Sequence, residues 1–232
     1  MVEIRGLEKF APKDFPGQIA STVFLGGCNF RCPFCHNLDL VLNPDSLPIF
    51  PLQYFKDYLE SRDGWLDGIC VSGGEPFIHK DLEMLLTILK GRDLLVKIDT
   101  NGSFPNRLQE LIEKKLIDQV AMDIKAPLDK YEEAAGVKVE ISKIRKSIKL
   151  LIQSGIDYVF RTTAVPGLIT VEDIEKIGKM LKGSKRFQIQ QFFPDRTLDE
   201  EYARKKPYTK QELEEFADIA RPYFSEVKIE GK

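Results

Sequence analysis

The sequence predicts an α/β fold in which strands and helices alternate along the 232-residue chain around a parallel sheet. Two observations support this prediction. Short runs rich in β-branched and aromatic residues alternate with segments of helical periodicity, and the connections between them are short. Such connections make right-handed crossovers between parallel strands. Six of these units are fewer than the eight of a closed barrel, so we expect an open or partial (β/α)6 TIM-like barrel, with a doubly wound sheet as the alternative.

The first elements have clear local signals. Residues 18–27 form a β-branched and aromatic run that ends in two glycines, which predicts a strand leading into a functional loop. Residues 51–64 carry apolar side chains at helical spacing and end at a glycine, which predicts a helix. A short apolar strand is expected at 67–74, and a helix at 81–91 with Asp81 as its N-cap.

The later elements repeat the same alternation. Pro105 stands in the first turn of one predicted helix, and Gly155 closes another. The further strands are expected at 94–102, 119–127, 157–167 and 186–194, and the further helices at 105–116, 142–155, 171–181 and 209–224. Residues 226–231 are a candidate edge strand.

Composition indicates a single domain. Hydrophobic residues make up 43% of the chain, which is enough for a sizeable core, and no linker rich in Pro, Gly or Ser divides it. We therefore expect one domain over 1–232, with a core at about 14–195 and a C-terminal helix and edge strand within 205–232.

Charge and hydropathy exclude several classes of partner. Lys and Arg number 34 against 36 Asp and Glu, for a net charge of −2, whereas a nucleic-acid-binding protein usually carries a basic surplus. No apolar run approaches the ~18 residues that span a bilayer, and the charged N-terminal segment has no apolar signal-peptide core. We expect a cytoplasmic protein that binds neither nucleic acid nor membrane. In a reducing compartment, clustered thiols more often bind metal or do redox chemistry than form disulfides.

The segment GGCNFRCPFCHN, residues 26–37, holds three of the four cysteines in the chain. Cys28, Cys32 and Cys35 are spaced C-x3-C-x2-C, as several corners of one compact iron–sulfur cluster require, and the fourth iron would stay open. A structural zinc site needs four ligands, and His36 directly follows Cys35, where it would seldom reach the same ion. A zinc site and a loop without metal remain alternatives. Cys70 lies in an apolar strand and is expected in the core.

Other unusual residues follow the ends of the predicted strands. These are the segments SGGEP (72–76), DTNG (99–102) and DIK (123–125), together with Arg161 ahead of VPG. Because parallel α/β folds place their sites at the carboxyl ends of the strands, we expect these segments and the cysteines to form one site. Alternation in a strand puts Asp123 and Lys125 on the same face.

These motifs together resemble a known family. C-x3-C-x2-C with Phe34 before its last cysteine, followed by SGGEP, resembles the signature of the radical S-adenosylmethionine (SAM) enzymes. DFPG (14–17), GCNFRCPFCHN, DTNG and DIK resemble the glycyl-radical-enzyme activases, which act on pyruvate formate-lyase and on anaerobic ribonucleotide reductase. DFPG is closer to the ribonucleotide reductase activating proteins. The resemblance covers residues from about 14 to 167.

The resemblance implies a cofactor set and a reaction. Cys28, Cys32 and Cys35 would hold a 4Fe–4S cluster whose open iron is chelated by the amino and carboxylate groups of SAM. An electron from a flavodoxin- or ferredoxin-type reductant would cleave SAM into methionine and a 5′-deoxyadenosyl radical. That radical would abstract a hydrogen from a glycine of a partner glycyl radical enzyme.

The resemblance also assigns the other site residues. Phe34 would lie near the adenine, and His36 and Asn37 would shape the pocket. Gly73, Gly74 and Glu75 would receive the methionine amino group. Asp99, Asp123 and Lys125 would bind SAM or a monovalent cation, with Lys125 pairing the SAM carboxylate, and Arg161 would contact the sugar or carboxylate.

The chain departs from the family in its later part. A histidine near the end of the sixth strand has no counterpart, and we expect Gln190 or Gln191 in its place. His79 is expected as a surface residue, and no cysteine after Cys70 supports an auxiliary cluster domain. Two other functions stay open: a radical SAM enzyme acting on a small molecule, like 7-carboxy-7-deazaguanine synthase, and a non-enzymatic Fe–S or zinc-binding module.

Overall fold

The computed structural model describes residues 2–231, which divide into two compact units. The first unit holds the residues up to Asn29 together with Asp39–Thr100 and Asn106–Val120. The second unit holds Phe30–Leu38, Asn101–Pro105 and the chain from Ala121 onward. The boundary runs through the cysteine loop, so that Cys28 belongs to the first unit and the other two loop cysteines to the second. The predicted single domain stays a prediction.

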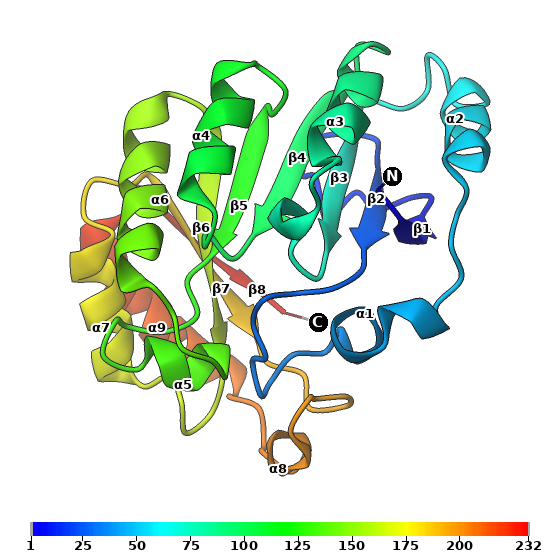
Figure 1. The fold of residues 1–232 in the computed structure, drawn as a ribbon. Coiled ribbons are helices and arrows are strands. Elements are labelled where there is room, and N and C mark those ends of the chain that lie inside the picture. Colours follow the sequence, from blue (N-terminus) through cyan, green and yellow to red (C-terminus); the bar gives the residue numbers. More distant parts are fainter. Residues whose placement is uncertain (1, 232) are drawn as a thin grey trace. The chain divides into compact units, whose positions relative to one another are not determined.

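The first unit contains four neighbouring strands in chain order (Figure 1). These are β1 (Ile4–Glu8), β2 (Ala20–Leu25), β3 (Gly68–Gly73) and β4 (Leu95–Thr100). β2, β3 and β4 are parallel, as expected, whereas β1 runs antiparallel to β2. β1 was not predicted from the sequence, because its segment IRGLE mixes charged and apolar residues without a clear strand pattern. Tertiary pairing with β2 makes it a strand.

The helices of the first unit use their apolar stripes for packing. In α3, Leu82, Leu85, Leu86 and Leu89 are buried at the i, i+3, i+4, i+7 spacing of one helix face, and the helix contacts β4. Asp81 occupies the N-cap position, but its side chain makes no capping hydrogen bond. The helical segments here are α1 (Leu38–Leu42), η1 (Pro44–Ser46), α2 (Leu52–Glu60), η2 (Pro76–Ile78), α3 (Leu82–Lys90) and α4 (Pro105–Glu113).

The second unit holds the remaining strands. They are β5 (Gln119–Asp123), β6 (Asp157–Ala164), β7 (Arg186–Gln191) and β8 (Glu226–Glu230). β6 pairs parallel with β7, and β7 parallel with β8, which confirms the expected strand at the C-terminal end. Alternation along β6 and β7 buries Phe160 and Phe187 on one face and leaves Arg161 and Gln188 half-buried on the other.

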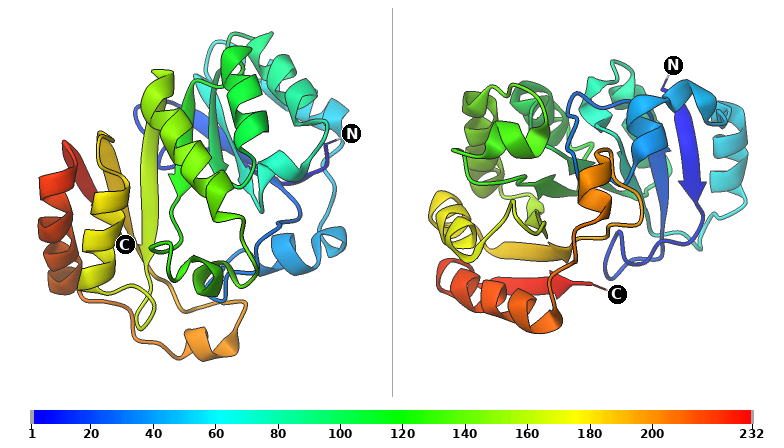
Figure 2. Two further views of the ribbon diagram at one scale, coloured as in Figure 1. Left: turned by 60° about the vertical axis from the view of Figure 1, so that its left-hand side comes forward. Right: turned by 90° about the horizontal axis from the view of Figure 1, so that it is seen from below.

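The helices of the second unit include two that the sequence did not predict. α9 packs against α7, β7 and β8, as Figure 2 shows, and capping boxes at Thr170 and Thr209 begin α7 and α9. The short helices α5 and α8 were missed because four or five residues are too few for a helical period to show. The set is α5 (Tyr131–Ala135), α6 (Ile141–Ser154), α7 (Val171–Met180), α8 (Glu200–Ala203), α9 (Lys210–Ala220) and η3 (Arg221–Tyr223).

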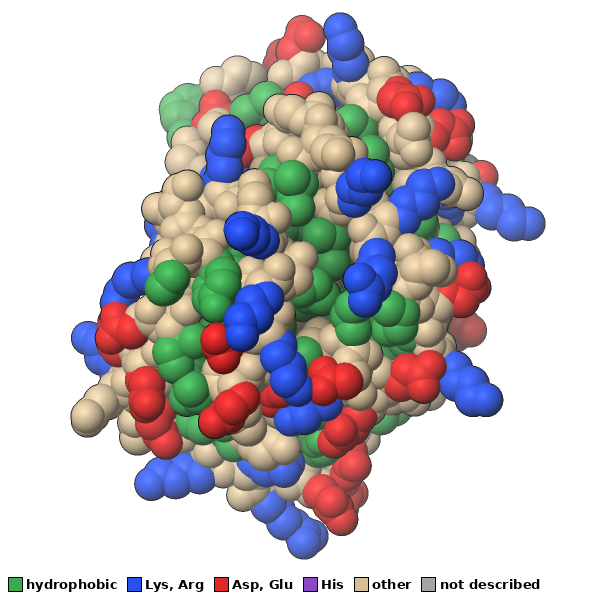
Figure 3. Space-filling model, turned by 90° about the vertical axis from the view of Figure 1, so that its left-hand side faces the viewer, with side chains coloured by type: hydrophobic (Ala, Val, Ile, Leu, Met, Phe, Trp, Pro, Cys, Tyr) green, Lys and Arg blue, Asp and Glu red, His purple; other side chains and the backbone are tan. Residues whose placement is uncertain are grey.

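Figure 3 shows basic and acidic side chains on the same face of the molecule. Several such residues form ion pairs at the surface, for example Lys176 with Asp129 and Lys179 with Glu175. Within residues 2–231, no helix combines the length and the apolar character that crossing a membrane would require.

Candidate active site

In the first unit, the glycine turn after β3 is joined to the segment that enters the cysteine loop. The Gly74 amide donates to the Leu25 carbonyl at 2.9 Å. Gly73 has φ +122°, and a Cβ there would lie 2.2 Å from the Leu25 oxygen. A Cβ on Gly74 would lie 1.8 Å from the oxygen of Gly27, the residue before Cys28. The two glycines therefore let two backbone segments approach closely, so that the turn positions the start of the cysteine loop.

Glu75 supports this turn from the inside. Its side chain is fully buried, and its Oε1 accepts hydrogen bonds from Thr100 Oγ1 at 2.8 Å and from the Phe77 amide at 3.2 Å. The Glu75 amide donates to the Gly27 carbonyl at 2.9 Å. The carboxylate thus caps η2 and ties the turn to the end of β4. Its contacts fix the shape of the turn.

The prediction that His79 is a surface residue was wrong. His79 is partly buried, and its Nε2 lies 2.8 Å from the Gly26 carbonyl, which can only accept, so Nε2 carries the proton. Burial lowers the pKa of His79. Arg107 of α4 donates to the backbone oxygens of Phe77 and His79, the latter at 2.7 Å. These long-range contacts had no signal in the sequence, because partners from separate elements meet only in the fold.

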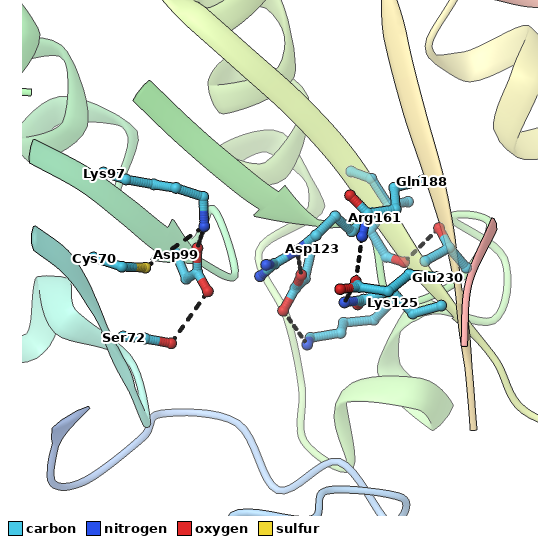
Figure 4. Close-up of polar contacts among 12 residues, drawn as sticks. Cys70, Ser72, Lys97, Asp99, Asp123, Lys125, Arg161, Gln188 and Glu230 are labelled. Atoms are coloured by element: carbon cyan, nitrogen blue, oxygen red, sulfur yellow. Dashed lines mark hydrogen bonds and ion pairs between the residues drawn. The ribbon is translucent and has the colours of Figure 1, made fainter. Parts of the chain in front are cut away.

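Asp99 lies in a polar cluster at the carboxyl end of β4 (Figure 4). Lys97 Nζ is paired with Asp99 Oδ1, and Ser72 Oγ donates to Asp99 Oδ2 at 3.2 Å. The Lys97 side chain is only 4% exposed, and its Nζ lies 3.5 Å from Cys70 Sγ. Cys70 is buried as expected, but it contacts a buried ammonium group. Asp99 was predicted from its motif and Lys97 was not, although the i, i+2 spacing on one strand places both on the same face.

The second unit brings together the three predicted charged residues. Asp123 Oδ2 lies 3.0 Å from Lys125 Nζ, and Asp123 Oδ1 accepts from Arg161 Nε at 2.8 Å (Figure 4). The expectation that Asp123 and Lys125 share a face is confirmed. Burial alone would raise the pKa of Asp123, but the charges of Arg161 and Lys125 lower it well below its ordinary value. Asp123 is therefore ionised at neutral pH and holds two cations in place.

Backbone contacts fix the position of this charged cluster. The Ile124 amide donates to the Arg161 carbonyl at 2.7 Å, and Thr162 Oγ1 donates to the Ile124 carbonyl at 3.0 Å. The buried Tyr131 hydroxyl donates to the Asp123 carbonyl at 3.4 Å, and burial raises the pKa of Tyr131. The end of β5 is thus tied both to β6 and to α5.

The second-unit part of the cysteine loop is held by two segments that the sequence did not single out. The Arg31 amide donates to Ala135 at the end of α5 at 2.8 Å, and the Asp199 amide donates to the Pro33 carbonyl at 2.9 Å. Gly136 has φ +66°, and a Cβ there would lie 2.0 Å from the Arg31 oxygen. The Cys35 amide donates to the Cys32 carbonyl at 3.0 Å, so these two cysteines bracket one turn.

The predicted residues near these cysteines differ in how deeply they are buried. Phe34 is buried, and its ring centroid lies 6.4 Å from that of Tyr202 in α8. His36 is exposed and Asn37 is half-buried. Burial would lower the pKa of Lys125, but the negative charges of Asp123 and of the Cys32 thiolate raise it above its ordinary value. Within this unit, the positive charge of Lys125 thus interacts electrostatically with Cys32 and Cys35.

The two glutamines proposed in place of the late histidine point to different partners. Gln190 Nε2 donates to Glu230 Oε2 at 3.1 Å. Gln188 donates to the same oxygen, and Figure 4 labels Gln188 and Glu230. Gln191 Nε2 instead donates to the Tyr208 carbonyl at 2.6 Å. Since Arg161 pairs in register with Gln188, and Gln190 lies two residues further on, Gln190 shares the face that carries Arg161.

The cysteine loop supplies the candidate donors for a metal centre. None of the four cysteines is in a disulfide, and the loop supplies three thiols. Within residues 2–231, no three His, Cys, Asp or Glu side chains form a group that could hold one metal ion. An iron–sulfur cluster takes each thiolate on a separate iron, whereas a structural zinc site needs four ligands that converge on one ion.

Comparison with known proteins of similar sequence gives relatives that match over most of their length. A protein of Methanocaldococcus jannaschii with the provisional name glycyl-radical enzyme activating enzyme is 37% identical over 97% of this chain and 95% of its own length. The pyruvate formate-lyase-activating enzyme of Streptococcus mutans is 31% identical over 85% of this chain and 78% of its own length.

Solved structures share the fold at low sequence identity. Streptococcus suis SuiB matches 89% of this chain with a TM-score of 0.68 and 19% identity, and the match spans 47% of SuiB. A domain of pyruvate-formate lyase-activating enzyme from Bacteroides vulgatus matches 71% of this chain and 99% of that domain, with a TM-score of 0.56 and 15% identity. With the parallel strands of both units, these similarities confirm the predicted class, an α/β partial barrel with a mostly parallel sheet.

The family assignment follows from the sequence profile that the chain matches. Residues 22–181 match the profile of the Radical SAM superfamily, and this span includes the three loop cysteines, the glycine turn and the charged cluster of β5 and β6. The family implies a 4Fe–4S cluster and S-adenosylmethionine as cofactors. The chain therefore belongs to the radical SAM superfamily.

Proposed function

We propose that the protein activates a partner enzyme by installing a glycyl radical, using SAM as the source of a 5′-deoxyadenosyl radical. The observation that carries this proposal is the end-to-end match with the M. jannaschii relative, which covers 97% of this chain. The similarity to pyruvate formate-lyase-activating enzymes supports the same reaction class. The substrate is then a glycine in a peptide segment of another protein.

Cys28, Cys32 and Cys35 are the proposed ligands of the cluster, with one iron left for SAM. When bound, the cluster supplies the electron that cleaves SAM. The chain's own contribution is to fix the three thiols. The Gly73–Gly74 turn sets the position of the loop entrance at Gly27, and the hydrogen bond from the Arg31 amide to Ala135 anchors the loop after Cys28.

The proposed SAM site uses the remaining polar groups for orientation. Lys125 is the group we assign to the SAM carboxylate, because Asp123 holds its ammonium in a fixed place and keeps it protonated. Arg161 is fixed by the same carboxylate and is assigned to the sugar or the carboxylate of SAM. The backbone of Gly73, Gly74 and Glu75 is assigned to the methionine amino group, because the Glu75 carboxylate already caps the turn.

Phe34 is assigned to the adenine of SAM, and His36 and Asn37 are assigned to the pocket for SAM and the substrate peptide. Phe34 is anchored by its contact with Tyr202, so its ring has a defined orientation. Of the two glutamines, Gln190 is our candidate for the missing late histidine, because it lies on the Arg161 face.

A glycyl radical assay tests the proposed function. The protein would be reconstituted anaerobically with iron and sulfide, reduced with dithionite or with flavodoxin or ferredoxin, and incubated with SAM and a glycyl radical enzyme. We expect a doublet glycyl radical signal in the electron paramagnetic resonance spectrum. A partner with its glycine replaced by alanine should give none. If 5′-deoxyadenosine forms with a heterocyclic small molecule and never with a glycyl radical enzyme, the protein is not an activase.

Metal analysis tests the ligand assignment separately. We expect the Cys28→Ser, Cys32→Ser and Cys35→Ser variants each to lose most of the iron and sulfide after reconstitution. Cys70→Ser is the matched control, because it changes the fourth cysteine and should keep the cluster. A wild-type protein that binds zinc and no sulfide would contradict the assignment.

A further inference from the structure

The carboxylates assigned to SAM or a monovalent cation are each already paired with a cation of the chain. Asp123 is held between Lys125 and Arg161 in the second unit. Asp99 is held by Lys97 in the first unit. The family resemblance assigns these carboxylates to SAM or to a nearby monovalent cation, but the residues present do not fit a free cation. At Asp99, the cation already present is the ammonium group of Lys97.

Lys97 is buried, and its ammonium group is held in one place. Its side chain is 4% exposed, and that of Asp99 is 17% exposed. A lysine this deeply buried needs a partner, since removing an unpaired ammonium group from water is strongly unfavourable. Asp99 supplies that partner through Oδ1, while its Oδ2 accepts from Ser72. The carboxylate is thus both neutralised and oriented at the end of β4 (Figure 4).

We propose that Lys97 is a built-in cation, whose ammonium group takes the place of a free monovalent cation beside Asp99. An ammonium group and a potassium ion carry the same charge and are similar in size, so one can substitute for the other beside a carboxylate. Lys97 acts here as a positioning residue, because it touches Asp99 and acts through it. The inference rests on the proposed function in assigning Asp99 to the SAM site. Its consequence is that SAM binding and cleavage do not depend on added K⁺ or Na⁺.

The first test uses thermal unfolding of the cluster-free protein, which needs no activity. Wild-type protein should have the same Tm in KCl and in tetramethylammonium chloride at equal ionic strength. In tetramethylammonium chloride, Lys97→Met should have a lower Tm than the wild type, because Asp99 loses its partner. We expect about 100 mM K⁺ or NH₄⁺ to raise the Tm of this variant by about 3 °C, because a cation that binds only the folded state stabilises it.

Two further variants make the test specific. Lys97→Met combined with Asp99→Asn removes both charges, and its Tm should not respond to the choice of cation. Lys114→Met removes an exposed lysine that pairs with Glu83 and Glu110, and it should behave like the wild type. A wild-type Tm that rises with K⁺ but not with tetramethylammonium would overturn the proposal, as would a Lys97→Met variant that gains no cation response.

The second test measures SAM cleavage to 5′-deoxyadenosine in the reconstituted protein, without any partner enzyme. Wild-type cleavage should be the same in K⁺ and tetramethylammonium, whereas Lys97→Met should be slower by about tenfold in tetramethylammonium and recover in K⁺. Equal loss in both salts would mean a structural role only and would contradict the proposal. Failure to form a glycyl radical would overturn the proposed function, while leaving the cation response of the cluster-free protein unchanged.

Discussion

The two units differ in the kind of group that their predicted site residues supply. In the first unit, the turn at Gly73 and Gly74 is made by backbone contact so close that no side chain fits. In the second unit, Asp123, Lys125 and Arg161 form an ion cluster that sets charge. The first unit thus supplies shape, and the second unit supplies charge. We therefore expect substitutions in the two units to have different effects on the protein.

The largest expected effect is that of Gly74→Ala in the first unit. The new Cβ would lie 1.8 Å from the Gly27 oxygen, so the backbone at the entrance of the cysteine loop must move. We expect the free energy of unfolding to fall by more than about 3 kcal/mol, measured by urea denaturation of the cluster-free protein.

Gly231→Ala is the matched control, because its Cβ would find only an ordinary contact of 3.5 Å with Gln191. It should change stability by less than about 0.5 kcal/mol. A Gly74→Ala variant as stable as this control would show that shape is not what the first unit supplies.

Asp123→Asn is the corresponding change in the second unit. It removes the charge that pairs Lys125 and Arg161 and leaves two partly buried cations side by side. We expect a loss of about 2 kcal/mol in the free energy of unfolding, less than for a fully buried pair, and a marked loss of SAM affinity in the reconstituted protein.

The exposed Asp129, which pairs with Lys176, provides the control for this charge. Asp129→Asn should have little effect on stability, because its ion pair is exposed to solvent, and it should leave SAM affinity unchanged. Equal effects of the two substitutions on SAM affinity would contradict a role for the Asp123 cluster in binding.

The pH dependence of stability should also show the contribution of the Asp123 charge. Because the folded-state pKa of Asp123 is depressed, its contribution is fully present above the unfolded-state pKa of about 3.9 and is lost as pH falls through the lower folded-state value. The difference in unfolding free energy between wild type and Asp123→Asn should therefore be constant from about pH 5 to 7 and shrink below about pH 4. A difference that grows on acidification would show that Asp123 is not held ionised by its neighbours.

The smallest expected effects separate the two glutamines of β7. Gln191→Ala loses the hydrogen bond to Tyr208 and should cost about 1 kcal/mol of stability with little change in SAM cleavage. Gln190→Ala should change the Tm only slightly, because Gln188 still donates to Glu230, and it should lower the rate of glycyl radical formation. If both variants affect only stability, neither glutamine replaces the late histidine.

The sequence predicted best those features that depend on local pattern. The strands β2 to β8 and the shared face of Asp123 and Lys125 all follow from periodicity, and the structure confirms them. The antiparallel strand β1 and the short helices α5 and α8 depend on tertiary contacts, and their segments are too short to show a period.

The site residues show the same division. Asp99 was named from its motif, whereas its partner Lys97 was not, although the i, i+2 spacing was visible in the sequence. The role of His79 could not be predicted, because its partner Gly26 is 53 residues away. The same holds for the hydrogen bond that Asp199 makes to Pro33 in the cysteine loop. Contacts between distant segments are set by the fold and leave no periodic signal.

The most direct test of the proposed activase function is the fate of the hydrogen removed from the partner. A glycyl radical enzyme made with glycine deuterated at Cα would be incubated with the reduced protein and SAM, and the 5′-deoxyadenosine would be analysed by mass spectrometry. We predict that the product carries one deuterium and that its amount matches the glycyl radical formed. Product without deuterium, formed at the same rate with and without the partner, would contradict the proposed function.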